Sequence, residues 1–300
     1  MPRVCLLLLM VMGFLLWKPV GAAAGSNRIS VMENQIRQYR EEIRKHPGNF
    51  QAHYNLGVVY SGAGRYKSAV RPLKTAIQLK PGSAKAHHYL GLVYASLRKF
   101  DDAIAEARRA LELDPELVEA RINLVISYEN LGKYEEIIDP LETLIQEKPN
   151  DPYYYSLLGS VLHRLERYKE SIDPLLKAIE LKSNNPEDFR NLGEAYLALG
   201  RYREAVDPLK EVIKRVPHFP EPQYNLGTAY AQLNRCQDAI GAFQKALKIS
   251  PRFAQAYANL AWCYQKLGKN ETAIEYYEKA LEINPKLKQV RHNLSFLKKN

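Results

Sequence analysis

The sequence predicts an all-α protein built from stacked helix pairs, and three observations lead to that prediction. The 300 residues have an ordinary soluble composition, with 46% hydrophobic and 25% charged residues. From residue 48 to residue 285 one pattern returns every 34 residues without an insertion. Within each period two segments carry apolar residues at helical spacing, and a turn separates them. With one capping helix at each end, we expect 16 helices and no strand.

The first 24 residues have the three parts of a secretory signal peptide. A basic start precedes an apolar run over residues 4–17, and small residues at 21–25 offer a cleavage site. The run is shorter than the roughly 20 apolar residues that span a bilayer, and Lys18 ends it. We expect cleavage after Ala24 and export to the periplasm or to the outside of the cell. An uncleaved anchor that leaves the protein on the same side of the membrane is the alternative.

The formal net charge of +10 does not indicate a nucleic-acid partner. Lysines and arginines are scattered along the predicted helices, whereas a nucleic-acid site would gather them in a patch or stripe. Beyond the leader, no segment is long and apolar enough to cross a membrane. We therefore expect no nucleic-acid partner and no membrane span after the leader is removed. The sequence leaves the oligomeric state open.

Each period is typical of a helix, a turn and a second helix. In the first period, residues 51–60 have apolar residues at helical spacing, and Gly64 suits the end of that helix. The second helix should run over about residues 67–80, with Ala69 and Leu73 on its apolar face. Pro81 follows and cannot continue the helix.

These columns resemble the tetratricopeptide repeat. The residues that match in the first period are Leu56, Gly57, Tyr60, Gly64, Tyr66, Ala69, Ala76 and Pro81. The resemblance implies a right-handed α-solenoid of seven repeats over residues 48–285, with capping helices over residues 25–47 and 286–300. It also implies that Gly57 faces Ala69, so that the two backbones approach closely. Because no repeat can bury its apolar face alone, the repeats must stack.

The third repeat should be irregular. Val125, Ile137 and Leu144 stand where most repeats have Gly, Ala and Ala, so its two helices should lie further apart. Four second helices also contain a proline, which should bend the helix or delay its start. These prolines are Pro72, Pro140, Pro174 and Pro208.

The sequence contains no motif for catalysis, a cofactor or a metal. Glycine-rich nucleotide loops, metalloprotease pairs and nucleophile elbows are all missing from it. Cys236 and Cys263 are read as two separate small packing residues, with a disulfide as the alternative. Asn270 and Asn293 fit the glycosylation sequon, or serve as polar turn and cap residues. We expect a non-catalytic protein that needs neither a cofactor nor a metal.

The resemblance places the ligand site in the concave groove lined by the first helices, where such arrays bind peptides or helices. One groove column is rich in asparagine, whose amide can pair with any extended main chain. Its members are Asn55, Asn123, Asn191, Asn225 and Asn259. Further candidates are apolar early in the chain and polar or aromatic later. They are Tyr54, Val58, Leu92, Ile122 and Ile126, then Arg190, Glu194, Tyr224 and Trp262. The resemblance offers an alternative for the asparagines, because Asn is common in this column throughout the family. For Val58 and its equivalents, the alternative is that they are partly buried between repeats.

The function predicted from these features is an interaction scaffold outside the cytoplasm. Its ligand would be a segment of another protein, apolar at one end and extended at the other. A clamp for a chaperone's C-terminal carboxylate is disfavoured, because Arg190 is the only basic residue in the clamp column. The alternative function is an accessory subunit of an envelope-assembly, secretion or glycosyltransferase complex. An enzyme is disfavoured, because no catalytic domain follows the repeats.

Overall fold

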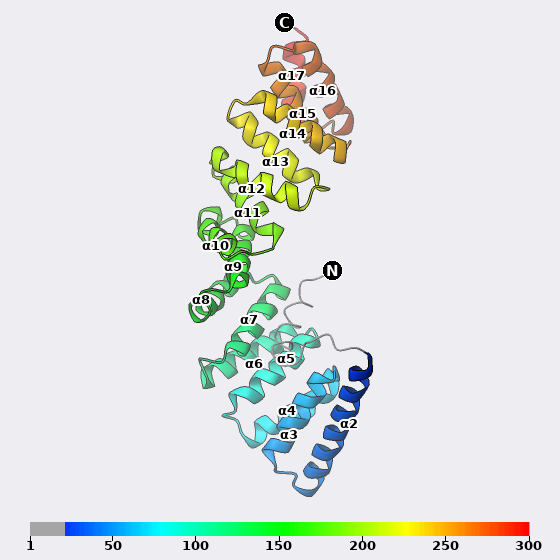
Figure 1. The fold of residues 1–300 in the computed structure, drawn as a ribbon, viewed down its shortest axis with the longest axis vertical. Helices are drawn as coiled ribbons and strands as arrows, with labels where there is room; N and C mark the ends of the chain where they lie inside the picture. Colours follow the sequence, from blue (N-terminus) through cyan, green and yellow to red (C-terminus); the bar gives the residue numbers. More distant parts are fainter. Residues whose placement is uncertain (1–21, 300) are drawn as a thin grey trace. The chain divides into compact units, whose positions relative to one another are not determined.

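The computed structural model describes residues 22–299, and every regular element in that range is helical. The chain divides after Glu147 into two compact units, each of which is described here by itself. Figure 1 labels the helices, which follow one another in chain order within each unit. Residues 1–21, which hold most of the predicted signal peptide, lie outside the described range.

The first unit contains a long N-terminal helix and three repeats. Its elements are α2 (Ala22–Lys45), α3 (Phe50–Gly62), α4 (Tyr66–Leu79), α5 (Ala84–Ser96), α6 (Phe100–Leu113), α7 (Val118–Leu131), the 3-10 turn η1 (Glu135–Ile137) and α8 (Ile138–Glu147). Each helix packs against the next, and the first helices α3, α5 and α7 also contact one another in order. Helix α2 begins before the predicted cap, and its Ile36 side chain is buried against the first repeat.

The second unit contains four repeats and a C-terminal helix. Its elements are α9 (Pro152–Arg164), α10 (Tyr168–Glu180), α11 (Pro186–Ala198), α12 (Tyr202–Arg215), α13 (Pro220–Gln232), α14 (Cys236–Ile249), α15 (Ala254–Lys266), α16 (Asn270–Ile283) and α17 (Lys288–Leu297). The first helices α9, α11, α13 and α15 contact one another in order. Helix α17 covers the last repeat with Val290 and leaves Phe296 exposed.

The helix starts follow from their capping residues. The side chains of Asn49 and Ser83 accept hydrogen bonds from backbone N–H groups in the first turns of α3 and α5. Asp151 and Asn185 do the same for α9 and α11, and each is followed by a proline at the first helical position. Helices α9 and α11 therefore begin at the proline that follows the capping residue, as the sequence indicates.

Close approach of the two helices in a repeat depends on glycine in the first helix. A Cβ on Gly57 would lie 2.4 Å from Cγ of Leu73, and one on Gly227 would lie 2.6 Å from Cε1 of Phe243. The expectation that Gly57 faces Ala69 is therefore wrong for its nearest contact, which is Leu73. In these two repeats the residue that meets the glycine lies one turn further along than the sequence comparison indicated. In the second repeat the expected column does meet it, because a Cβ on Gly91 would lie 3.2 Å from the backbone oxygen of Ala103.

The third repeat is irregular, as predicted. Its second helix is reduced to the 3-10 turn η1 and the 10-residue helix α8, whereas the other second helices run for 13 or 14 residues. Helix α7 also packs far less extensively against α8 than other first helices do against their partners. Val125 puts a branched side chain in a column where the first, fourth, fifth and sixth repeats lack room even for a Cβ atom, so α8 cannot approach closely. Pro140 lies in the first turn of the delayed helix, whereas Pro72 lies inside a continuous one.

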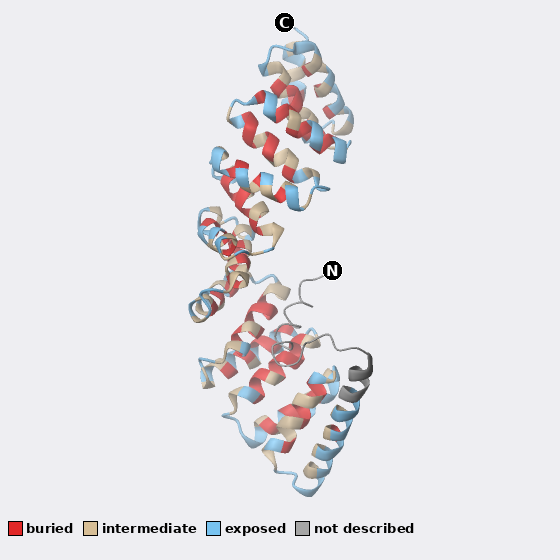
Figure 2. Ribbon diagram, in the orientation of Figure 1, coloured by how far each residue is buried: buried red, intermediate tan, exposed pale blue. Residues whose placement is uncertain are grey.

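The core of each unit lies between the helices. Figure 2 shows buried residues along the inner sides of the helices and exposed residues on the turns. Large side chains such as Leu73, Leu141, Leu209 and Phe243 have no exposed surface. The second helices supply them. Glycines of the first helices make room for Leu73, Leu209 and Phe243, whereas Leu141 lies in the repeat with Val125.

Candidate ligand-binding face

The candidate residues lie on one side of the first helices, and we call this surface the first-helix face. In the first unit it consists of residues on α3, α5 and α7, and in the second unit of residues on α9, α11, α13 and α15. Its sequence-predicted members are Tyr54, Asn55, Val58, Leu92, Ile122, Asn123 and Ile126 in the first unit, and Arg190, Asn191, Glu194, Tyr224, Asn225, Asn259 and Trp262 in the second.

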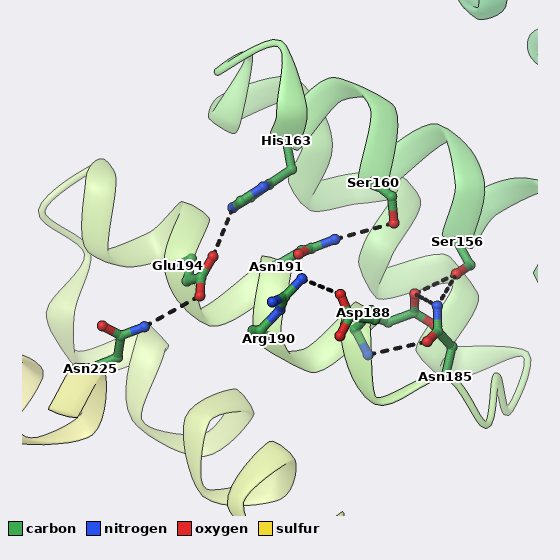
Figure 3. Close-up of polar contacts among 10 residues, drawn as sticks. Ser156, Ser160, His163, Asn185, Asp188, Arg190, Asn191, Glu194 and Asn225 are labelled. Carbon is green, nitrogen blue, oxygen red and sulfur yellow. Dashed lines mark hydrogen bonds and ion pairs between the residues drawn. The ribbon is translucent and has the colours of Figure 1, made fainter. Parts of the chain in front are cut away.

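The asparagine amides of the second unit join neighbouring repeats. Asn191 Nδ2 donates to Ser160 Oγ at 3.2 Å, from α11 to α9. Asn225 Nδ2 donates to Glu194 Oε1 at 3.4 Å, from α13 to α11 (Figure 3). Both amides therefore use a donor to fasten one first helix to the one before it.

Two further asparagines of the column make the same kind of contact. Asn259 Nδ2 donates to the Tyr224 hydroxyl at 3.1 Å, and Asn123 Nδ2 lies 3.1 Å from His88 Nδ1. Asn123 has no exposed surface, so it presents nothing to a ligand. Asn55 has no preceding repeat, and its Oδ1 accepts a hydrogen bond from Gln51 at 2.8 Å. A packing role that the sequence did not reveal is thus present at the four later asparagines, and it is the whole role of Asn123.

The apolar part of the predicted groove is partly inaccessible. Leu92 is 3% exposed and Ile126 is 1% exposed, so neither side chain can contact a ligand in this structure. Val58, Ile122 and Tyr54 keep part of their surface exposed. The expected apolar stripe is therefore corrected to three partly exposed residues, because Leu92 and Ile126 belong to the core of the first unit.

The second unit presents a charged cluster on α11. Arg190 forms an ion pair with Glu187 one turn away, and its side chain remains 42% exposed. Glu194 Oε2 lies 3.4 Å from Nε2 of His163 on α9, as Figure 3 shows. These four side chains place two carboxylates, a guanidinium and an imidazole on a single stretch of the face.

Burial and neighbouring charges set the protonation of this cluster. Burial lowers the pKa of His163, and the positive charge of Arg190 lowers it further, so the ring is neutral near pH 7. Burial raises the pKa of Glu194, Arg190 offsets part of that rise, and the carboxylates of Glu187 and Glu221 add to it. The carboxylates are therefore close enough to repel one another.

Two aromatic residues complete this part of the face. The Tyr224 ring lies 4.8 Å from the Phe253 ring and 5.8 Å from the Phe243 ring, measured between centroids. The Lys266 ammonium lies 5.4 Å from the centroid of the Trp262 ring. Tyr224 and Trp262 are partly exposed, so both offer aromatic surface that core packing holds in place.

A buried polar junction between α9 and α11 was missed in the sequence. Ser156 Oγ donates to Oδ1 of Asp188 at 2.5 Å, and Asn185 Nδ2 donates to Ser156 Oγ at 3.0 Å (Figure 3). Asp188 has no exposed surface. The other repeats have Ala, Tyr or Pro in its column, so an acidic residue there was the available signal. Because its oxygens face the protein interior, this junction positions the two helices and offers nothing to a ligand.

Two further findings concern the described residues. Across residues 22–299 no group of three or more His, Cys, Asp or Glu side chains is arranged to hold a metal ion. Over the same range, no helix combines the length and the apolar character needed to cross a membrane.

Sequence comparisons identify the repeat. Family models described as tetratricopeptide repeat match residues 36–84 and 190–252, residues 94–161 and residues 254–287, and one described as TPR repeat matches residues 159–200. Together these matches cover well over half of the chain. No curated protein sequence matches it.

Solved structures show the same fold. A crystal structure of MamA matches with a TM-score of 0.53 and 24% identity, covering 57% of this chain and 94% of that one. MamA from Desulfovibrio magneticus RS-1 matches with a TM-score of 0.53 and 22% identity, covering 58% and 98%. The structure of Naa15/Naa10 bound to HypK-THB gives 0.61 at 15% identity, and the match covers 96% of this chain but only 44% of that one. At these identities the likeness concerns the fold alone.

Proposed function

Because the chain belongs to the tetratricopeptide repeat family, we propose that it is a non-catalytic scaffold that binds a segment of another protein on its first-helix face. The observation that carries this proposal is the surface of the second unit. There Arg190, Tyr224 and Trp262 combine partial exposure with a fixed position. Arg and aromatic side chains of this kind dominate the energetics of protein interfaces.

The second unit is the better candidate for the main contact. In the first unit, Leu92, Asn123 and Ile126 have little or no exposed surface. In the second unit, every predicted member of the face except Asn191 is partly exposed. An approaching segment therefore finds more accessible polar and aromatic groups on α11, α13 and α15.

The charges on this face favour a segment that carries a basic side chain. Glu187 and Glu221 both raise the pKa of Glu194, whereas Arg190, which pairs with Glu187, lowers it. A lysine or arginine of the ligand would relieve the repulsion among these carboxylates and gain a charge-assisted hydrogen bond. A ligand that ends in carboxylates would be repelled, which agrees with the unsuitable clamp column.

The proposed location is outside the cytoplasm, in the periplasm or the extracellular space. The support is the basic start, the apolar run at residues 4–17 and the small residues after it. Sequencing the N-terminus of the natural protein tests this location. A chain that begins at Gly25 supports export with cleavage, and a chain that still begins at Met1 or Pro2 supports a membrane anchor.

The partner can be identified by cross-linking in native extract, and the contact can then be measured by calorimetry. Trp262→Ala and Arg190→Ala should each weaken binding at least about tenfold, because each removes a buried contact of the interface. Lys298→Ala is the matched control, because Lys298 follows the terminal helix α17 and pairs with Glu278 on the second helix α16, and neither residue belongs to the proposed face. Equal affinities for all three variants would refute the proposed face.

The charge argument has its own test. Glu221→Gln should weaken binding, and the loss should shrink as salt is added, because screening reduces the attraction. Glu275→Gln is the control, since Glu275 is an exposed carboxylate on α16, a second helix. A pull-down from native extract separates the free scaffold from the accessory subunit. Recovery of an enzyme in fixed stoichiometry with this protein would favour the accessory-subunit alternative.

A further inference from the structure

The two cysteines within residues 22–299 lie on adjacent helices of the second unit. Cys236 is the first residue of α14, Cys263 lies in the third turn of α15, and these helices pack against each other. Both belong to one buried apolar cluster, with 8% and 0% of their surfaces exposed. The Cys236 thiol also contributes to the raised pKa of the Cys263 thiol, as expected for two groups that lie near each other in this cluster. Both are free thiols in this structure.

The repeat pattern shows that this pair is unusual within the chain. The column of Cys236 otherwise holds aromatic residues and one Asn: Tyr66, Phe100, Tyr134, Tyr168, Tyr202 and Asn270. The column of Cys263 otherwise holds small or β-branched residues: Val59, Val93, Ser127, Val161, Ala195 and Ala229. Only at the junction of the sixth and seventh repeats do both columns carry sulfur. Ordinary packing at this junction is thus possible without cysteine.

We propose that Cys236 and Cys263 close into a reversible disulfide that joins the sixth repeat to the seventh. The geometric requirement is that the two sulfur atoms approach to a bond of about 2.05 Å. Both side chains lie in the cluster between α14 and α15, so rotation about the short cysteine side chains is the movement that closure would use. The proposal stands independently of the binding function proposed above.

The reaction needs a disulfide oxidant, and glutathione disulfide serves as the example. The Cys236 thiolate, which is the more exposed of the two, attacks one sulfur of the oxidant and releases one glutathione thiolate. Cys263 then gives its proton to solvent and attacks the Cys236 sulfur, which releases the second glutathione. Two protein thiols lose two electrons and two protons, and one oxidant disulfide becomes two thiols.

The second step should be the slow one at neutral pH. Burial, and then the neighbouring Cys236, raise the pKa of the Cys263 thiol to about 12. The thiolate is the nucleophile, and at any pH below this pKa the thiolate fraction rises about tenfold for each unit by which the pH increases. Closure should therefore accelerate strongly between pH 7 and pH 9.

The bond would restrain the part of the first-helix face that carries Trp262. Trp262 precedes Cys263 on α15, and Tyr224 lies on α13, which packs against α14. Tying α14 to α15 closes a loop between the two cysteines, and closure restricts the unfolded chain. Oxidation should raise the melting temperature of the second unit by about 5–10 °C.

The test uses the full chain, purified with reductant and then exposed to glutathione disulfide. Free thiols are blocked with N-ethylmaleimide, and the protein is digested with trypsin. The tryptic peptides 236–245 and 253–266 should appear joined in the oxidised sample and separate after dithiothreitol. The rate of joining should rise with pH, and thermal unfolding should move upward and return on reduction.

Two variants control the experiment. Cys263→Ala places alanine where Ala195 and Ala229 stand in other repeats, and it should accumulate glutathione on Cys236 without closing. Cys5→Ser removes the remaining cysteine and should leave the joined peptides unchanged. The proposal is overturned if the native chain keeps glutathione on Cys236 at pH 9 without joining the peptides. Pairing of either cysteine with Cys5, or a bond that lowers the melting temperature, would also overturn it.

Discussion

Replacing Gly227 with alanine tests whether the glycine column sets the spacing between the helices of a repeat. A Cβ at this position would lie 2.6 Å from Cε1, 2.7 Å from Cδ1 and 3.0 Å from Cζ of Phe243. Phe243 is fully buried, so its ring can move only by displacing its neighbours. Overpacking of this kind costs about 1–3 kcal/mol, and alanine regains about 1 kcal/mol of helix propensity. The net effect should be a loss on the order of 1 kcal/mol.

The same repeat contains a matched control. Gly241 lies inside α14, and a Cβ there would meet no atom within 4 Å. Gly241→Ala should therefore stabilise the protein by about 1 kcal/mol through propensity alone. The two variants make the same chemical change, so the difference of about 2 kcal/mol between them reports the contact with Phe243.

Urea unfolding followed by far-ultraviolet circular dichroism can measure both variants. Repeat arrays can depart from two-state behaviour, so the midpoints are compared only where the m-values agree with the unsubstituted chain. Hydrogen exchange at α13 and α14 then locates the effect. If Gly227→Ala proves as stable as Gly241→Ala, the close-approach argument fails. Phe243 also lies against Tyr224, so displacement of the ring should weaken ligand binding too.

Two further predictions concern the turn and a buried histidine. Glu166 has a φ of 60°, in the left-handed region that Gly200 occupies in the next repeat. Glu166→Gly should therefore stabilise the folded protein by about 1 kcal/mol. Gly200→Ala should destabilise it by a similar amount in the same urea assay. Burial lowers the pKa of His88 to about 4 from its ordinary value of 6.5, so the unfolded chain takes up its proton first as the pH falls. Stability should be complete above pH 6.5 and drop by on the order of 3 kcal/mol towards pH 4, a loss that His88→Gln should reduce; an unchanged pH profile in that variant would contradict the assignment.

The repeat register, the helix pairs and the irregular third repeat could all be predicted from the sequence. They depend on local features, namely the 34-residue period, the capping residues and the volume of Val125 in a column of glycines. Such features act within a repeat, where the spacing of residues along two connected helices fixes what can meet. The exact neighbour of Gly57 was nevertheless misjudged, because the side chain of Leu73 reaches it from one turn further along α4.

The candidate site was less predictable, because it depends on contacts between repeats. The columns that hold Asn191 and Ile126 could be found by counting, but counting does not show whether a side chain faces a ligand or a neighbouring helix. In the structure Asn191 donates a hydrogen bond to Ser160, and Ile126 is buried. The Ser156–Asp188 contact likewise joins residues 32 positions apart, beyond the reach of any pattern within one repeat.

The asparagine hydrogen bonds give the second unit a direction. Asn191, Asn225 and Asn259 each donate to an acceptor on the preceding first helix, never to the following one. A ribosome makes the chain from its N-terminus, so the acceptor of each bond is synthesised before its donor. Each newly synthesised repeat can therefore pack against a preceding repeat that already carries the hydrogen-bond acceptor. Deleting whole repeats from the C-terminal side would leave every remaining asparagine of this column with its acceptor. Deleting repeats from the N-terminal side would leave the first remaining asparagine without its acceptor.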